Sequence, residues 1–198
     1  MWNDEFNKII PLITAESNNA YLDKNEHIRS STKVETAQDR FLKNFKSKNN
    51  SINIQRSYPI LSSLRMIKDK VEIDLISHAC KITEKGFRRV LKFIKPEVNE
   101  YDIEAELIHE FIINKSKGFA YQPIIATGIN ACSLHYNDNN TICKSGELVL
   151  MDVAAEYANY KSDMTRTVPI NGKFTKRQRE IYNAVLNVKN EATKLLVT

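Results

Sequence analysis

Residues 148–168 read LVLMDVAAEYANYKSDMTRTV and place two aspartates, Asp152 and Asp163, in segments that otherwise have the composition of buried strands. Between them, Glu156-Tyr157-Ala158-Asn159 is the natural turn, because Asn is a good turn former. A hairpin centred on 157–158 puts the two aspartates directly opposite each other on one face, with Cβ atoms roughly 4.5–5.5 Å apart. The stretch therefore predicts an antiparallel hairpin that carries a pair of adjacent carboxylates.

Two carboxylates this close need a physical explanation. They should repel each other, and one would be expected to take up a proton. A bound divalent cation removes the repulsion, and a pair of cations suits two bridging carboxylates. The alternative is one solvent-facing aspartate and one buried aspartate tied to backbone amides. The pair by itself leaves both readings open.

The hairpin resembles the metal-binding hairpin of the proline-specific aminopeptidases, the Xaa-Pro aminopeptidase (aminopeptidase P) group of the pita-bread metallopeptidases. Two upstream segments resemble the same family in the same order. Residues 64–73, LRMIKDKVEI, resemble the entry to its catalytic domain, and residues 119–136, FAYQPIIATGINACSLHY, resemble its substrate-side segment. The string SDMTRT is the most specific of these motifs. The resemblance covers at least residues 64–198.

The resemblance implies a fold class and a division into domains. The expected class is α+β, a partial pita-bread fold. Residues 1–63 would be a remnant of the N-terminal, creatinase-like domain, and residues 64–198 the N-terminal half of the metallopeptidase domain. In the first part only Ile52 and Ile54 alternate like a short strand, and composition alone leaves open a partly disordered extension.

Periodicity predicts three helices, near 70–95, 100–116 and 176–196, around a strand-rich segment at 121–170. Each helix is preceded by a capping signal: Asp69 with Glu72, Asn99 with Asp102, and Thr175 with Gln178. The residues expected to face inward on the first two helices are Ile73, Ile76, Ala79, Cys80, Thr83, Phe87, Val90, Leu91, Ile94, Ile103, Leu107, Ile108, Phe111 and Ile112. Helices before and after a strand group are typical of an α+β protein.

By the resemblance, Asp152 and Asp163 are metal ligands. Members of the family bind two metals through two aspartates followed by a histidine and two glutamates. All four histidines here, His27, His78, His109 and His135, precede Asp152. The three later ligands are therefore expected to be missing, and the chain to be an inactive fragment of a longer enzyme.

The resemblance assigns catalytic roles to His135 and Tyr121. His135 would donate a hydrogen bond to the scissile carbonyl as charge develops on its oxygen, although a lone histidine is more often structural. Tyr121 would orient a metal ligand and the bridging solvent, and a half-buried core tyrosine is the alternative. Arg166 is expected to be structural, with its guanidinium paired to nearby carboxylates.

The implied function is a metal-dependent aminopeptidase that releases the N-terminal residue from peptides with proline second, using water activated by two metals. Oxygen-rich ligation favours manganese, with cobalt or zinc as substitutes. A prolidase, which cuts only dipeptides, and a non-catalytic pita-bread binding module remain alternatives. One difference from the family pattern leaves the alternative of a non-catalytic module open: Ala154 stands where the family hairpin usually has a small glycine.

The composition of the chain argues against other classes of protein, such as nucleic-acid-binding and membrane proteins. The chain has 42% hydrophobic and 27% charged residues, which are globular values. Its net charge of +5 comes from Lys and Arg that alternate with acids, so solvated helix faces explain it better than nucleic-acid binding. No stretch is long and apolar enough to suggest a membrane partner. Three cysteines without zinc-type spacing suggest thiols in a cytoplasmic protein. The full-length protein is expected to be a homo-oligomer.

Overall fold

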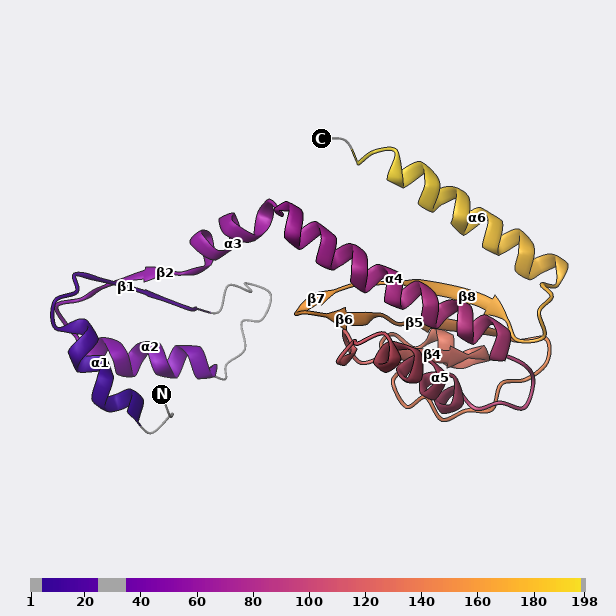
Figure 1. Cartoon of the computed structure of the whole chain (residues 1–198), viewed down its shortest axis with the longest axis horizontal. Coiled ribbons are helices and arrows are strands. Elements are labelled where there is room, and N and C mark those ends of the chain that lie inside the picture. The colour runs from indigo at the N-terminus through magenta and orange to yellow at the C-terminus, as the bar shows by residue number, and fades with distance from the viewer. Residues whose placement is uncertain (1–4, 25–34, 197–198) are drawn as a thin grey trace. The chain divides into compact units, whose positions relative to one another are not determined.

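The computed structural model describes residues 5–24 and 35–196, and the chain divides into two compact units, Met1–Lys68 and Asp69–Thr198 (Figure 1). Each unit has its own helices and strands. All four candidate site residues, Tyr121, His135, Asp152 and Asp163, belong to the second unit.

The first unit combines a pair of parallel strands with three helices. Its elements are α1 (Phe6–Thr14), β1 (Asn19–Leu22), α2 (Ala37–Lys48), β2 (Asn53–Arg56) and α3 (Tyr58–Met66). β1 pairs with β2 along its whole length, and Phe45 and Ile52 are buried. The short strand predicted around Ile52 and Ile54 is confirmed by β2, although Ile52 lies just before it. The described residues of this unit form helices and strands.

Three helices of the second unit confirm the predicted ones. They are α4 (Lys70–Phe93), α5 (Glu100–Ile113) and α6 (Lys176–Thr193), and each ends two or three residues earlier than expected. The side chains of Asp69 and Thr175 cap α4 and α6 in reciprocal capping boxes. α4 ends just before Pro96, which disfavours a helical conformation in the residue before it. Within the described ranges, no helix combines the length and apolarity needed to cross a bilayer.

The buried faces of these helices are narrower than predicted. On α4 the buried residues are Ala79, Ile82, Thr83, Gly86 and Val90. Ile73, Leu91 and Cys80, all expected to face inward, are exposed. On α5, Ile112 is 59% exposed, whereas Ile103, Leu107 and Phe111 are fully buried. Neighbouring elements bury only one narrow face of each helix. The residues predicted to face inward covered a wider part of the helix surface than this face.

The strands in the described residues of the second unit form two three-stranded antiparallel sheets. One has the order β4 (Ile124–Thr127), β5 (Leu148–Asp152) and β8 (Thr165–Pro169). The other has the order β3 (Gly118–Phe119), β6 (Ala155–Tyr157) and β7 (Tyr160–Lys161). α4 and α5 pack against each other and against these strands, as expected for an α+β protein (Figure 1). The buried core is Ile82, Val90, Val98, Ile103, Leu107, Phe111, Ile125, Cys143, Val149, Met151, Val153, Ala155 and Ile170.

The predicted hairpin is present, but its register differs from the prediction. Asp152 pairs with Thr165, and Tyr157 pairs with Tyr160. The turn is therefore centred between Ala158 and Asn159, one residue later than expected. Both turn residues have positive φ, 50° and 66°, as in the tight hairpin turns that match the twist of the strands. The prediction that Asp163 lies directly opposite Asp152 is wrong: Asp163 lies two residues before Thr165, the partner of Asp152, and outside the paired residues of β8. A two-residue shift keeps a side chain on the same face.

A close contact between α4 and α5 gives a test of this packing. A Cβ atom on Gly86 would lie 2.7 Å from Cε1 of Phe111, and the Phe111 ring is fully buried and packs edge-on against Phe119. We expect Gly86→Ala to lower the free energy of unfolding by about 1–2 kcal/mol, because a contact this short with a buried ring calls for the upper part of the usual overpacking cost of about 1–3 kcal/mol, and a helix-propensity gain of about 1 kcal/mol offsets only part of it. Urea denaturation measures the change, with the exposed Lys85→Ala as control. An unchanged or more stable Gly86→Ala protein would contradict this packing.

Candidate metal centre

The two aspartates converge on one tyrosine. Asp152 is the last residue of β5, and Asp163 lies in the break between β7 and β8. The hydroxyl of Tyr121 donates to Oδ1 of Asp152 at 2.6 Å and lies 3.3 Å from Oδ1 of Asp163. Neither aspartate is buried, and in the described part of the chain no backbone amide donates to their carboxylates. The alternative of one buried aspartate tied to amides is therefore wrong.

Tyr121 is held as a neutral donor. Partial burial raises the pKa of its phenol, and the hydrogen bond to Asp152 and the negative charges of Asp152 and Asp163 raise it further. The protonated hydroxyl can therefore bridge the pair near neutral pH. Of the two readings of this residue, a half-buried core tyrosine and an orienting tyrosine, the hydrogen bonds favour the second.

A closed ring of hydrogen bonds fixes the backbone between the aspartates. The N–H of Ala155 donates to Oγ1 of Thr83 at 2.8 Å, and Oγ of Ser162 donates to the carbonyl of Ala155 at 2.9 Å. The hydroxyl of Thr83 therefore donates to Oγ of Ser162, 2.7 Å away. Both hydroxyl side chains are buried. This Thr83 ring ties α4 to the residues that follow Asp152 and precede Asp163.

His135 lies on the same cleft as the aspartates. A hollow of about 330 Å³ is lined by Tyr121, Gln122, Ile124, His135, Asn137, Asp152 and Asp163. The structure thus brings all four residues singled out from the sequence to one site. His135 is exposed and has a left-handed backbone, with φ 56°. Among the described residues, its side chain has no hydrogen-bond partner.

Sequence reasoning missed the residues that hold this site in place. Thr83 was placed on the inward face of its helix, but its bonds to Ala155 and Ser162 were not foreseen. Asn139 was not singled out, yet it is buried: its side-chain oxygen accepts from the N–H of Ile125, and its NH₂ group donates to Glu104. Glu100 was missed altogether. Its signal was available, since it shares the apolar spacing of Ile103 and Leu107 on α5.

The departure at Ala154 is accommodated by the fold. Ala154 is fully buried in the break between β5 and β6, and its carbonyl accepts a hydrogen bond from Ala120 at 2.8 Å. Its φ is not in the left-handed region that favours glycine. A methyl group at this position therefore does not disturb the hairpin.

The residues of the cleft fit part of a metal site. Carboxylate oxygens are hard donors, which suit ions such as Mn²⁺. Within residues 5–24 and 35–196, however, no three His, Cys, Asp or Glu side chains form a metal-binding group. Ions of this class take about six ligands in all. Asp152 and Asp163 would therefore supply two protein ligands of a larger coordination shell.

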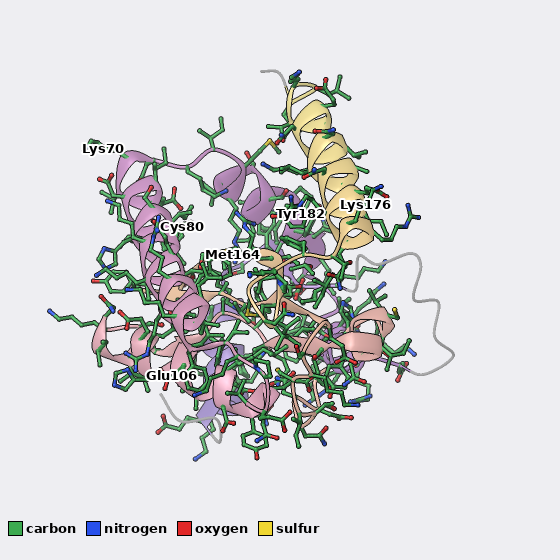
Figure 2. All side chains as sticks on the ribbon, turned by 90° about the vertical axis from the view of Figure 1, so that its right-hand side faces the viewer. Lys70, Cys80, Glu106, Met164, Lys176 and Tyr182 are labelled. Carbon is green, nitrogen blue, oxygen red and sulfur yellow. The ribbon has the colours of Figure 1, made fainter. Side chains whose placement is uncertain are left out.

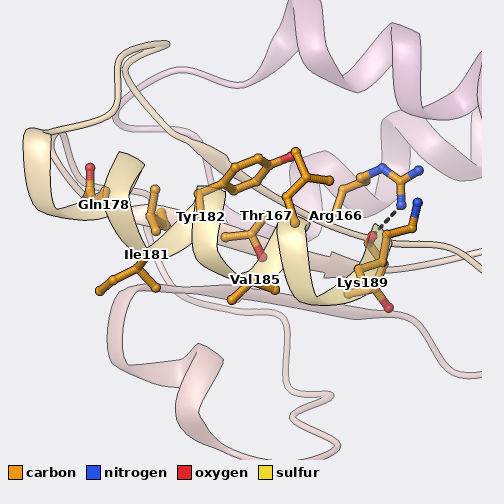
Figure 3. A pocket seen from close by; sticks show the side chains of 10 residues that line it. Arg166, Thr167, Gln178, Ile181, Tyr182, Val185 and Lys189 are labelled. Carbon is orange, nitrogen blue, oxygen red and sulfur yellow. Dashed lines mark hydrogen bonds between the residues drawn. The ribbon is translucent and has the colours of Figure 1, made fainter. Parts of the chain in front are cut away.

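A second hollow, of about 490 Å³, lies between β8 and α6 (Figure 3). It is lined mainly by apolar side chains of α6, including Ile181, Tyr182 and Val185, and neither aspartate contributes to it. Arg166 also lines it, and its guanidinium donates to the backbone carbonyl of Thr165 at 2.7 Å (Figure 3). The expectation that Arg166 pairs with carboxylates is wrong for the described residues.

Residues 74–197, well over half of the chain, match metallopeptidase family M24. The chain belongs to this family. Members of this metallopeptidase family use divalent metals. Membership also confirms the resemblance to the pita-bread metallopeptidases that the hairpin motif suggested.

Among its M24 relatives, the Xaa-Pro aminopeptidase of Haemophilus influenzae is 43% identical over 139 residues, which are 70% of this chain and 32% of that protein. Xaa-Pro aminopeptidase 3 of Homo sapiens is 33% identical over 192 residues, 97% of this chain and 37% of that protein. Among solved structures, proline aminopeptidase P II from Yersinia pestis matches 96% of this chain with a TM-score of 0.80 and 31% identity, over 44% of its own chain. The chain thus spans less than half the length of these M24 proteins, and its fold is that of aminopeptidase P.

The Thr83 ring gives a second test of the site. Thr83→Val removes the hydroxyl and leaves the buried N–H of Ala155 without its acceptor. We expect the free energy of unfolding to fall by about 1–3 kcal/mol, the usual cost of a buried unsatisfied donor. Thr83→Ser keeps the hydroxyl and is the control in urea denaturation. If the valine variant were as stable as the serine variant, the ring would not contribute to the free energy of unfolding.

Proposed function

We propose that the protein to which this chain belongs is a metal-dependent aminopeptidase that removes the N-terminal residue from peptides with proline second. The observation that carries this proposal is the convergence of Asp152 and Asp163 on the hydroxyl of Tyr121, in a cleft shared with His135. The relatives named Xaa-Pro aminopeptidase support this substrate class over prolidase. The intact carboxylate pair favours an enzyme over a non-catalytic binding module.

Asp152 and Asp163 are the metal ligands in this proposal. We propose two manganese ions, with cobalt or zinc able to substitute, and a zinc-substituted form of the Escherichia coli aminopeptidase P has been solved. When bound, such ions supply Lewis acidity that activates water near neutral pH. Tyr121 holds Asp152 through its 2.6 Å hydrogen bond and so fixes the direction of the ligand oxygens.

His135 acts on the substrate rather than on the metals. It lies on the wall of the cleft with no hydrogen-bond partner among the described residues, so its imidazole is available to a bound peptide. A donor placed there would hydrogen-bond to the scissile carbonyl oxygen as negative charge develops. The division of roles is therefore metal binding by the aspartates and oxyanion stabilisation by His135.

The remaining proposals concern organisation. We assign residues 1–63 to the end of a smaller N-terminal domain and residues 64–198 to the first half of the metallopeptidase domain. The three free cysteines, Cys80, Cys132 and Cys143, fit a reducing, cytoplasmic compartment. The full-length protein is proposed to be a homo-oligomer that acts on peptides rather than on nucleic acid.

The division of roles is tested by substitution in the complete protein. Asp152→Asn or Asp163→Asn should reduce cleavage of an Xaa-Pro peptide to background and lower the bound manganese, because each removes a charged ligand. His135→Ala should lower kcat about 100-fold, the usual effect of losing one oxyanion donor, with manganese content unchanged. Metal analysis and steady-state kinetics give the two readouts.

Matched controls for these variants lie outside the cleft. Asp23→Asn and His109→Ala change exposed residues of the same types and should leave both readouts as in the unsubstituted protein. Loss of stoichiometric manganese from the His135→Ala protein would refute the separation of the two roles.

The 198-residue chain alone is expected to have no aminopeptidase activity. Two aspartates without a third ligand in the described residues leave a metal largely hydrated and weakly held. The chain should also self-associate, because α6, the helix that carries Lys176 and Tyr182 in Figure 2, exposes Ile181, Val185 and Leu186. Incubation of the purified chain with manganese and an Xaa-Pro peptide measures activity. If the purified chain cleaves the peptide and its Asp152→Asn variant does not, the described residues are sufficient for aminopeptidase activity and this prediction is wrong.

A further inference from the structure

Glu100 is a buried carboxylate that no ion pair compensates among the described residues. It is the first residue of α5 and is 0% exposed. In the part of the chain that the structure describes, no Lys, Arg or His forms a salt bridge with it. A buried charge is costly unless hydrogen bonds and local dipoles stabilise it. The N-terminus of α5 provides one such dipole, and the rest must come from direct hydrogen bonds.

Four hydrogen-bond donors surround this carboxylate. Oε1 accepts from the N–H of Thr127 at 2.7 Å and lies 3.4 Å from Nδ2 of Asn130. Oε2 accepts from the hydroxyl of Tyr136 at 2.8 Å and from the N–H of Thr141 at 3.0 Å. Each oxygen thus accepts from two donors, as both oxygens of a carboxylate can. A glutamine in this place would turn an NH₂ group towards one of the two donor pairs.

All four donors belong to one segment, residues 127–141, which runs from the end of β4 through η2 (Gly128–Cys132) to the turn that carries His135. His135 itself has a left-handed φ of 56° and an exposed side chain. Such a backbone persists in a non-glycine residue only where its surroundings impose it. Its neighbour Tyr136 is bound to Glu100 and also donates its N–H to the carbonyl of Ser133 at 3.3 Å.

We infer that Glu100 is a positioning residue, which fixes the 127–141 segment and so holds His135 on the wall of the aspartate cleft. This inference rests on the proposed function for its effect on catalysis. Glu100 touches neither Asp152 nor Asp163 by any hydrogen bond among the described residues. Its removal should therefore impair turnover through His135 and leave metal binding unaffected.

The decisive experiment is a double-mutant cycle in the complete protein, with manganese and an Xaa-Pro peptide. Glu100→Gln should lower kcat at least tenfold, with KM and manganese content within twofold of the unsubstituted protein. In a His135→Ala background the same substitution should cost less than twofold, because the group that it positions is already gone. Equal losses in both backgrounds would overturn the inference, since a general structural defect acts regardless of His135.

Two further variants guard against a folding defect. Tyr136→Phe removes only one of the four donors, and should lower kcat several-fold with the same dependence on His135. Ile103→Val, a core change on the same helix face without polar contact to the segment, is the control and should leave kcat unchanged. Loss of activity in Ile103→Val as large as in Glu100→Gln would also count against a specific role.

A second readout does not depend on activity. Amide hydrogen exchange followed by mass spectrometry should show faster exchange in Glu100→Gln, confined to residues 127–141. Unchanged protection of this segment would overturn the inference. If the unsubstituted protein shows no turnover, the proposed function fails, and hydrogen exchange alone decides whether Glu100 anchors the segment.

Discussion

The closed ring of hydrogen bonds among Thr83, Ala155 and Ser162 is the interaction on which the site depends. It joins α4 to the hairpin at the breaks between β5 and β6 and between β7 and β8. There the side chains of Thr83 and Ser162 form hydrogen bonds with the N–H and the carbonyl of Ala155. Because the interruption occurs at the same level in both strands, the pairing register is the same on either side of it. Asp152 and Asp163 therefore stay on one face although they are not paired directly.

Local signals were sufficient to predict the helices and the hairpin. Capping pairs and apolar spacing placed α4, α5 and α6 within three residues of their ends. The predicted centre of the turn was one residue too early, which shifts each cross-strand partner by two residues. Ala158 has a positive φ in the structure, but alanine does not favour that conformation, so the sequence indicated only Asn159 as a turn residue. The face shared by the aspartates was still predicted, since a two-residue error leaves the alternation of side chains unchanged.

The supporting residues of the site could not be predicted in the same way. The contacts of Glu100 with Tyr136 and of Asn139 with Glu104 each link positions about 35 residues apart in the chain. Nothing in the local pattern around Asn139 distinguishes a buried anchor from an exposed turn residue. Motif resemblance found the side chains that face the cleft, Tyr121 and His135, whereas the hydrogen-bond partners of the polar groups behind them are visible only when the chain is folded.

The span of the Thr83–Ser162 contact also bears on the order of folding. The two residues are 79 positions apart, whereas the pairs of the hairpin between Asp152 and Thr165 are close in sequence. Local pairs close quickly, and distant ones must first overcome a larger loop-closure entropy. We therefore expect the hairpin to form before α4 docks on it. On this order the aspartates meet early, as a flexible pair, and gain a fixed geometry only when α4 docks, so the cation binding that we propose for them would arise in two stages.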